Sequence, residues 1–122
     1  MGEYKLLLEH SHDPAYATLA GYQAKGGYAA LKKALGMERQ AIIDEVKASG
    51  LRGRGGAGFP TWIKWNGIPK EKNGKHYLIC NADEGEPGTF KDKQLMETTP
   101  FLLIEGMTIA GFATQGDAGY IY

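Results

Sequence analysis

The most constraining feature of this chain is a glycine-rich stretch at residues 50–61, GLRGRGGAGFPT, which holds five glycines and two arginines. Within it, Gly53, Gly55 and Gly58 match the G-x-G-x-x-G pattern of dinucleotide-binding folds. That pattern requires a strand before the glycines and a helix after them. Residues 38–49, however, repeat apolar side chains at helical spacing, so a helix is predicted before the loop. The ordinary first turn of a Rossmann fold is therefore not predicted here.

The loop can still serve a ligand, because glycine amides approach a flat ring or a phosphate closely and can form an anion-binding nest. Arg52, Arg54 and Lys64 supply cationic donors nearby. Arginine can bind a phosphate with two parallel hydrogen bonds, whereas lysine acts as a point charge. Phe59 could stack on a base. The alternative interpretation is a flexible surface loop with solvated arginines.

A second polar loop, NADEGEPG at residues 81–88, follows a predicted strand. The carboxyl ends of strands are where open α/β sheets bind ligands. Asn81 offers a donor and an acceptor, while ionised Asp83, Glu84 and Glu86 only accept hydrogen bonds. These groups suit ring N–H groups and ribose hydroxyls, but they would repel a phosphate. A Mg²⁺ or Ca²⁺ site and a solvated acidic turn are the alternatives, although the spacing is not that of a calcium loop.

Length and composition narrow the class of protein. The chain has 122 residues, 43% of them hydrophobic, which suits one small folded domain. Fourteen basic and fourteen acidic residues cancel, which gives no electrostatic case for nucleic acid or an anionic membrane surface. The single cysteine, Cys80, excludes an internal disulfide and an all-cysteine metal site. The most apolar stretch, residues 100–113, is interrupted by Glu105 and is too short to span a bilayer, so a buried helix is predicted.

Periodicity and punctuation predict an α/β order of elements. Amphipathic patterns, proline starts and glycine stops predict the helices, and short β-branched or aromatic runs predict the strands. The expected helices are 16–21, 28–35, 38–49, 60–65, 92–98 and 100–113, and the expected strands are 76–81 and 119–122. A strand, a helical crossover and a second strand predict a parallel pair. A second strand that runs to the last residue suggests a truncated domain.

Taken together, GLRGRGGAGFPT, the following WIKW and the later CNADEGEPGTFKD resemble the flavoprotein subunit of respiratory NADH:quinone oxidoreductase, complex I. Diaphorase subunits of NAD-linked hydrogenases and formate dehydrogenases are similar. The resemblance runs from about residue 12 to residue 122. It implies an α/β fold: an incomplete Rossmann-like three-layer FMN-binding domain with N-terminal helices. Residues 1–36 would form the helical segment and residues 37–122 the partial FMN/NADH-binding domain.

The resemblance also implies roles for individual residues. The expected FMN contacts are Gly53, Arg54, Gly55, Gly56, Lys64, Asn81, Asp83 and Glu84. The expected NADH contacts are Phe59 and Glu86. The family's chemistry is hydride transfer from NADH to the flavin N5, followed by single-electron transfer to iron–sulfur clusters. The cofactor carries that step, so no catalytic side chain and no metal ligand is expected in this chain.

Departures from the family's pattern limit what can be carried over. Asn66 and Gly67 stand where the family often has a second aromatic residue after K-W. The family's Gly-Glu-Glu segment, and the cysteines that hold its [4Fe–4S] cluster, are absent from the sequence. A fragment of a longer subunit is therefore expected, with NADH, the missing C-terminal part and a thioredoxin-like iron–sulfur subunit as partners. The expected location is the cytoplasm, peripheral to the inner face of the plasma membrane, without membrane insertion.

Two other functions remain open on the sequence. The chain could be a binding or assembly module without activity of its own, whose unpaired last strand recruits a partner. It could also be a nucleotide-binding regulatory domain that uses the same loops without redox chemistry.

Overall fold

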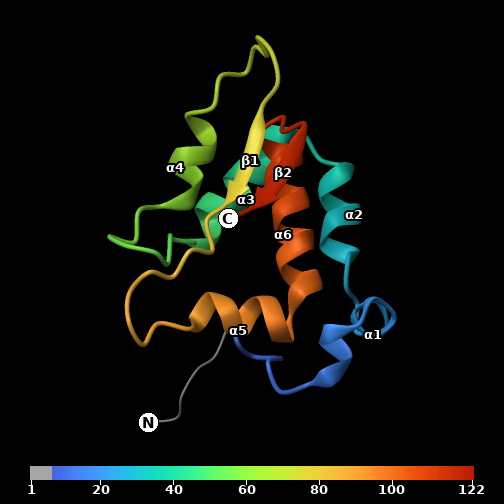
Figure 1. Ribbon diagram of the computed structural model, residues 1–122. Helices are drawn as coiled ribbons and strands as arrows, with labels where there is room; N and C mark the ends of the chain where they lie inside the picture. The colour runs from blue at the N-terminus through green and yellow to red at the C-terminus, as the bar shows by residue number, and fades with distance from the viewer. Residues whose placement is uncertain (1–6) are drawn as a thin grey trace.

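The computed structural model describes residues 7–122, so the first six residues of the predicted N-terminal segment lie outside the described part (Figure 1). The elements in chain order are η1 (Pro14–Ala17), α1 (Leu19–Ala24), α2 (Ala29–Leu35), α3 (Arg39–Ser49), α4 (Thr61–Asn66), β1 (Tyr77–Cys80), α5 (Lys91–Thr98), α6 (Pro100–Ala113) and β2 (Ala118–Ile121). The predicted elements are thus confirmed with boundaries shifted by a few residues, except that η1 and α1 form two helical pieces where the sequence predicts one helix, 16–21. The predicted end of the helix α3 at Gly50 is confirmed, and Gly50 has a left-handed φ of 69°.

The sheet consists of β1 and β2, which run parallel with Tyr77 opposite Ala118 and Cys80 opposite Ile121. The helices α5 and α6 form the crossover between the two strands. The pairing continues past β1, because the Ala82 amide donates to the Tyr122 carbonyl at 2.7 Å. This arrangement confirms the predicted parallel pair. It also directs the carboxyl ends of both strands toward the acidic loop.

Ion pairing holds the start of β2 against the loop that leads into β1. The Asp117 carboxylate accepts hydrogen bonds from the Lys72 ammonium and, at 2.8 Å, from the His76 amide. The Lys72 contact and then the His76 hydrogen bond lower the pKa of Asp117 below its usual value. Because both donors precede β1 and Asp117 precedes β2, these bonds fix the two strands in register.

The hydrophobic core lies between α2, α3 and α6. Ala34, Ile42, Ile43 and Ala113 are buried together there. Partly buried side chains pack around them: Met37, Trp62, Trp65, Ile109 and Phe112. The predicted apolar stripe of α3 therefore faces the core, and the two tryptophans of α4 attach that helix to it. This packing holds α4, and the glycine loop before it, against the rest of the molecule.

The prediction that residues 100–113 form a buried helix is only partly correct. The helix α6 lies between the sheet and the N-terminal helices (Figure 1), but Leu102 and Ile104 are 39% and 43% exposed. Glu105, which interrupts the apolar run in the sequence, is instead only 5% exposed. The sequence pattern could not show this, because the helix is apolar on nearly all sides and gives no preferred face.

Glu105 is buried because its carboxylate accepts hydrogen bonds from backbone amides at the start of α2. Its carboxylate accepts hydrogen bonds from the amides of Tyr28 and Leu31, both at 3.0 Å, and from the Tyr22 hydroxyl. Tyr28 has a left-handed φ of 68° and precedes the first turn of α2, where orphan amides need an acceptor. Burial, and then the contact with Glu105, raise the pKa of the Tyr22 hydroxyl above its usual value.

These observations confirm the α/β class with a small parallel sheet. The Rossmann-like three-layer arrangement stays a prediction, because one face of the sheet is exposed. Tyr77, Ile79 and Tyr120 share that face and are 59%, 64% and 58% exposed. The division at residues 36 and 37 also stays a prediction.

Candidate functional site

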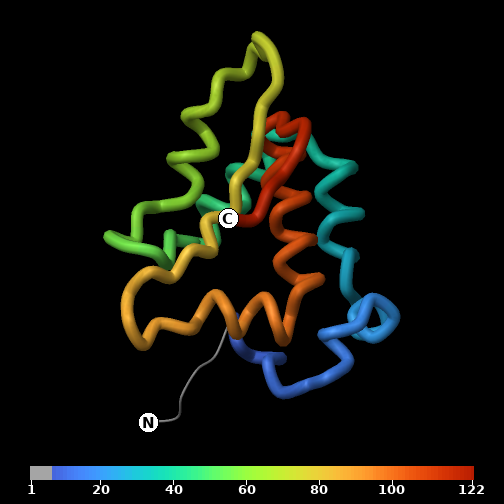
Figure 2. The backbone as a smooth tube through the Cα atoms, in the orientation of Figure 1, coloured from blue at the N-terminus to red at the C-terminus, as the bar shows by residue number. Residues whose placement is uncertain are grey.

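The glycine loop closes on itself as a short hairpin between α3 and α4. The Gly53 amide donates to the Phe59 carbonyl at 3.0 Å, and the Thr61 amide donates to the Leu51 carbonyl at 3.1 Å. Residues 54–57, enclosed by the Gly53–Phe59 bond, form the exposed tip. The base of the loop is therefore fixed, while its tip extends from the molecule toward the acidic loop (Figure 2).

The two arginines of the loop differ in their contacts. The Arg52 guanidinium donates from Nη1 to the Gly58 carbonyl at 3.1 Å, across the base of the hairpin. The sequence suggested Arg52 only as a nearby cationic donor, whereas in the structure it holds the loop closed. The Arg54 guanidinium donates from Nη1 to the Arg52 carbonyl at 3.0 Å. This bond turns Arg54 along the tip and leaves its other N–H donors for a ligand.

The glycines at the tip are not equivalent. Gly58 has a φ of 67°, a conformation that side chains rarely adopt, so the turn itself requires glycine there. Gly55 and Gly56 are outside that region, and a Cβ atom added to either would meet no described atom within 4 Å. Nothing in the chain's own packing requires glycine at these two positions. The bare backbone instead leaves a space that a flat ligand could occupy.

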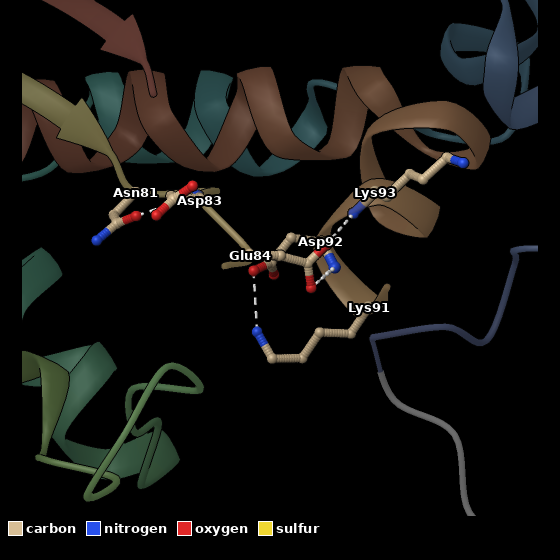
Figure 3. A network of polar contacts seen from close by, with 6 residues as sticks. All are labelled: Asn81, Asp83, Glu84, Lys91, Asp92 and Lys93. Carbon is tan, nitrogen blue, oxygen red and sulfur yellow. Dashed lines mark hydrogen bonds and ion pairs between the residues drawn. The ribbon is translucent and has the colours of Figure 1, made fainter. Parts of the chain in front are cut away.

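The acidic loop directly follows β1, and two of its side chains accept hydrogen bonds from backbone amides of the loop and of α5 (Figure 3). The Asn81 side-chain oxygen accepts from the Asp83 amide at 3.1 Å, which forms an Asx turn. The two Glu84 oxygens accept from the amides of Asp92 and Lys93, at 3.1 and 2.9 Å. Glu84 is therefore the N-terminal cap of α5.

The electrostatics of Glu84 reflect this capping. Desolvation opposes its ionisation, but the hydrogen bonds from the Lys93 and Asp92 amides, together with the Lys91 charge, outweigh it. The pKa of Glu84 is consequently below its usual value, so this carboxylate stays ionised and acts as an acceptor at neutral pH.

The two loops face each other across a pair of adjoining cavities, which we call the cleft. The glycine-loop cavity, of about 340 Å³, is lined by Gly53, Gly55, Gly56, Ala57, Gly58, Phe59, Lys64, Asn81, Asp83, Lys91 and Asp92. The acidic-loop cavity, of about 450 Å³, is lined by Arg54, Gly55, Gly56, Asp83, Glu84, Gly85, Glu86, Thr89 and Lys91. Every residue that the sequence predicted for FMN or NADH lines one of these two cavities. Both volumes lie within the usual range of small-molecule sites.

An aromatic side chain and a lysine meet at one end of the glycine-loop cavity. Phe59 is 48% exposed, and the Lys64 Nζ atom lies 5.6 Å from the centre of its ring. This cation–π contact connects α4 to the glycine loop. Because about half of Phe59 is exposed, its ring is available for stacking. Lys64 places positive charge beside that ring.

The sequence pattern did not single out Lys91, Asp92 or Thr89, which also line the cleft. The Lys91 ammonium donates to the Asp92 carboxylate at 2.9 Å (Figure 3). The signal was available, because the motif continues as GTFKD directly after the acidic loop. Residues 92–98 by themselves indicate only a polar helix, since periodicity cannot show that the first turn of a helix borders a site.

Two further observations on the described residues concern metal binding and membrane crossing. Within residues 7–122, no three histidine, cysteine, aspartate and glutamate side chains gather closely enough to hold a metal ion. Over the same residues, no helix has the length and apolar character needed to cross a membrane.

Comparison with known protein families identifies the region that contains the cleft. Residues 46–122 match the family model of the Nuo51 FMN-binding domain. This match begins within α3 and includes the glycine loop, both strands and the acidic loop.

Individual relatives agree with this match. The second NADH-quinone oxidoreductase F-type subunit of Rhizobium meliloti (strain 1021) is 50% identical over 118 residues, which cover 96% of this chain and 28% of the relative. The NADH-quinone oxidoreductase F-type subunit of Escherichia coli (strain K12) is 52% identical over 103 residues, which cover 83% of this chain and 23% of the relative. The chain thus spans about a quarter of the length of these relatives.

A solved structure has the same fold over almost all of this chain. The crystal structure of an NAD⁺-reducing [NiFe]-hydrogenase in the H₂-reduced state superposes with a TM-score of 0.70 and 39% sequence identity. The match covers 98% of this chain and 19% of the hydrogenase chain. The resemblance found in the sequence, to complex I flavoprotein subunits and to the related module of NAD-linked hydrogenases, is confirmed.

Proposed function

Because this chain belongs to the Nuo51 FMN-binding family of NADH-quinone oxidoreductase F-type subunits, we propose that its cleft binds FMN and NADH for hydride transfer between them. One observation carries the proposal. A cation-bearing glycine loop, residues 50–61, and an acidic loop, residues 81–88, form opposite walls of one cleft. The first wall suits phosphate and a flat ring, and the second suits ring N–H groups and hydroxyls.

The residues present fit a flavin. Gly55 and Gly56 leave open space that a Cβ atom would partly fill, and neither needs to be glycine for the fold. Lys64 and Arg54 supply cationic donors from the same wall. On the facing wall, Asn81 has its amide N–H₂ group available, since its side-chain oxygen already accepts from Asp83. We assign Gly53, Arg54, Gly55, Gly56, Lys64, Asn81, Asp83 and Glu84 to FMN.

Phe59 and Glu86 are assigned to NADH. Phe59 is exposed at the edge of the glycine-loop cavity, where a nicotinamide or adenine ring could stack on it. Glu86 is exposed in the acidic-loop cavity and can accept hydrogen bonds from ribose hydroxyls.

The protein's contribution to the reaction is placement and electrostatics. FMN, when bound, would accept a hydride from NADH and release electrons one at a time to iron–sulfur clusters of an assembly. Walls that hold two ring systems in contact supply the proximity that hydride transfer requires. The partners would be the remainder of the F-type subunit and a thioredoxin-like iron–sulfur subunit, at the cytoplasmic face of the plasma membrane.

An assembly module without activity of its own is the second candidate, and one observation favours it. The face of the sheet that carries Tyr77, Ile79 and Tyr120 is exposed, and Ile121 on the last strand is 51% exposed. An apolar sheet face of this kind is typical of an interaction surface.

The direct test is flavin binding followed by reduction. The purified chain is titrated with FMN while flavin fluorescence is recorded, and NADH is then added without oxygen. We expect saturable FMN binding and loss of the flavin absorbance after NADH addition. Glu86→Gln should weaken NADH binding and leave FMN binding intact, because Glu86 is assigned only to the dinucleotide.

Opposite outcomes would separate the candidates. A folded chain that takes up no FMN would leave the assembly function for this chain. FMN binding without reduction by NADH would support a nucleotide-binding domain without redox chemistry. Equal loss of FMN and NADH binding in Glu86→Gln would contradict the division of roles between the loops.

A further inference from the structure

Lys91 lies where the two halves of the cleft meet. It lines both the glycine-loop cavity and the acidic-loop cavity, as do Gly55, Gly56 and Asp83. Of these four residues, only Lys91 carries a positive charge. A ligand that occupies either half of the cleft therefore comes close to this residue.

The carboxylates of the acidic wall are not equally available to a ligand. The Glu84 carboxylate is engaged by the amides of Asp92 and Lys93, and the Asp92 carboxylate pairs with Lys91. Asp83 and Glu86 are the exposed carboxylates of this wall. Because Glu84 already uses the first amides of α5, an anion on this wall of the cleft must be bound by side chains.

The Lys91 side chain is suited to that role. It is 43% exposed, and its backbone is fixed at the first position of α5 by the Glu84 cap on the next two residues. An ammonium group has three donors, and the bond to Asp92 uses one of them. Arg54 lies on the opposite wall of the acidic-loop cavity, with one N–H donor directed to the Arg52 carbonyl.

We propose that Lys91 is a phosphate-binding residue, which holds a phosphate group of the bound nucleotide from the acidic wall while Arg54 holds it from the glycine wall. This inference rests on the proposed function. It revises the expectation that the acidic loop would repel phosphate, because Lys91, at the first position of α5, adds a cationic donor to that wall. The shared chemistry is a phosphate ester, which FMN and the dinucleotide both carry.

The test compares ligands that carry phosphate with ligands that lack it. FMN is compared with riboflavin, and ADP-ribose with adenosine, for the whole 122-residue chain and its Lys91→Gln variant. We expect Lys91→Gln to weaken FMN or ADP-ribose by about tenfold, the effect of one charge-assisted hydrogen bond. Riboflavin and adenosine binding should not change. The ligand pair that responds identifies which phosphate lies at Lys91.

Two further variants serve as controls. Lys93→Gln removes the same charge two residues along α5, where the side chain faces Glu97 and a different surface hollow. It should leave all four affinities unchanged. Lys91→Arg should restore most of the phosphate preference, because it keeps a cationic donor at the position.

The outcomes distinguish this inference from the proposed function. If the unaltered chain binds the nucleotides and Lys91→Gln changes nothing, only the role of Lys91 is overturned. Equal weakening of phosphate-bearing and phosphate-free ligands would also overturn it, since Lys91 would then act on the shape of the cleft. If the unaltered chain binds none of the four ligands, both proposals are wrong for this chain.

Discussion

Single residues of the glycine loop have separate physical reasons for being what they are. Gly58 is required by its positive φ, and Arg52 closes the hairpin through the Gly58 carbonyl. The fold gives no such reason for Gly55 and Gly56. Neither has a positive φ, and a Cβ atom added to either would meet no described neighbour. In the sequence all these glycines look alike, and only the backbone conformation separates Gly58 from Gly55 and Gly56.

This difference predicts opposite effects of two valine substitutions. Gly55→Val should abolish FMN binding while leaving the free energy of unfolding nearly unchanged, because the side chain projects into the cleft. Gly58→Val should lower the free energy of unfolding by about 1 to 2 kcal/mol, the cost of a left-handed conformation for a residue with a Cβ atom. FMN titration and urea unfolding of both variants measure the two effects. Unchanged FMN affinity in Gly55→Val would refute the position of the flavin.

At the scale of elements, α5 depends on a residue outside itself. Phe90 precedes the helix and carries no side-chain acceptor, so the first amides of α5 would lack partners. Glu84, several residues earlier, supplies both oxygens. The acidic loop is therefore part of the structure of α5 as well as a wall of the cleft.

The lowered pKa of Glu84 makes this cap dependent on pH. A group whose pKa is lower in the folded state contributes stability above its unfolded pKa, about 4.3 for glutamate, and loses it as pH falls through the folded value. We expect the amides of Asp92 and Lys93 to be protected from hydrogen exchange near neutral pH and to lose protection in that acidic window. Glu84→Gln should show reduced protection at every pH. Protection that is independent of pH in the unaltered chain would contradict the cap.

For the whole molecule, Glu105 connects parts of the chain that are far apart in sequence. Its carboxylate on α6 accepts from Tyr22, Tyr28 and Leu31, which lie 74 to 83 residues earlier. The N-terminal helices are thus attached to the same helix that packs against the sheet. The cleft residues belong to loops whose positions depend on this packing.

Removing the Glu105 carboxylate should destabilise the folded state. Glu105→Ala leaves a buried hydroxyl and two backbone amides without an acceptor, and each costs about 1 to 3 kcal/mol. We expect the free energy of unfolding to fall by at least about 3 kcal/mol in urea denaturation. Tyr22→Phe removes one of the three bonds and should cost less. Thr108→Ala, an exposed position on α6, is the control and should have little effect.

The sequence by itself determined the order of helices and strands, the parallel pair and the two loops of the site. These features depend on local information: periodicity, glycine and proline positions, and a motif long enough to identify a family. It also predicted ten residues that the fold brings to one cleft. Their contacts with FMN and NADH remain predictions.

Only the tertiary structure decided which partners those residues have. Glu84 caps α5, Lys91 borders both cavities and Glu105 is buried, and none of this follows from residue type or spacing. The physical reason is that a carboxylate or an ammonium group is polar in any sequence, whereas its function depends on the donors and acceptors that folding brings within hydrogen-bonding distance. GLRGRGGAGFPT predicted a close approach of the backbone to a ligand, and the fold determined that the acidic loop and Lys91 lie opposite it.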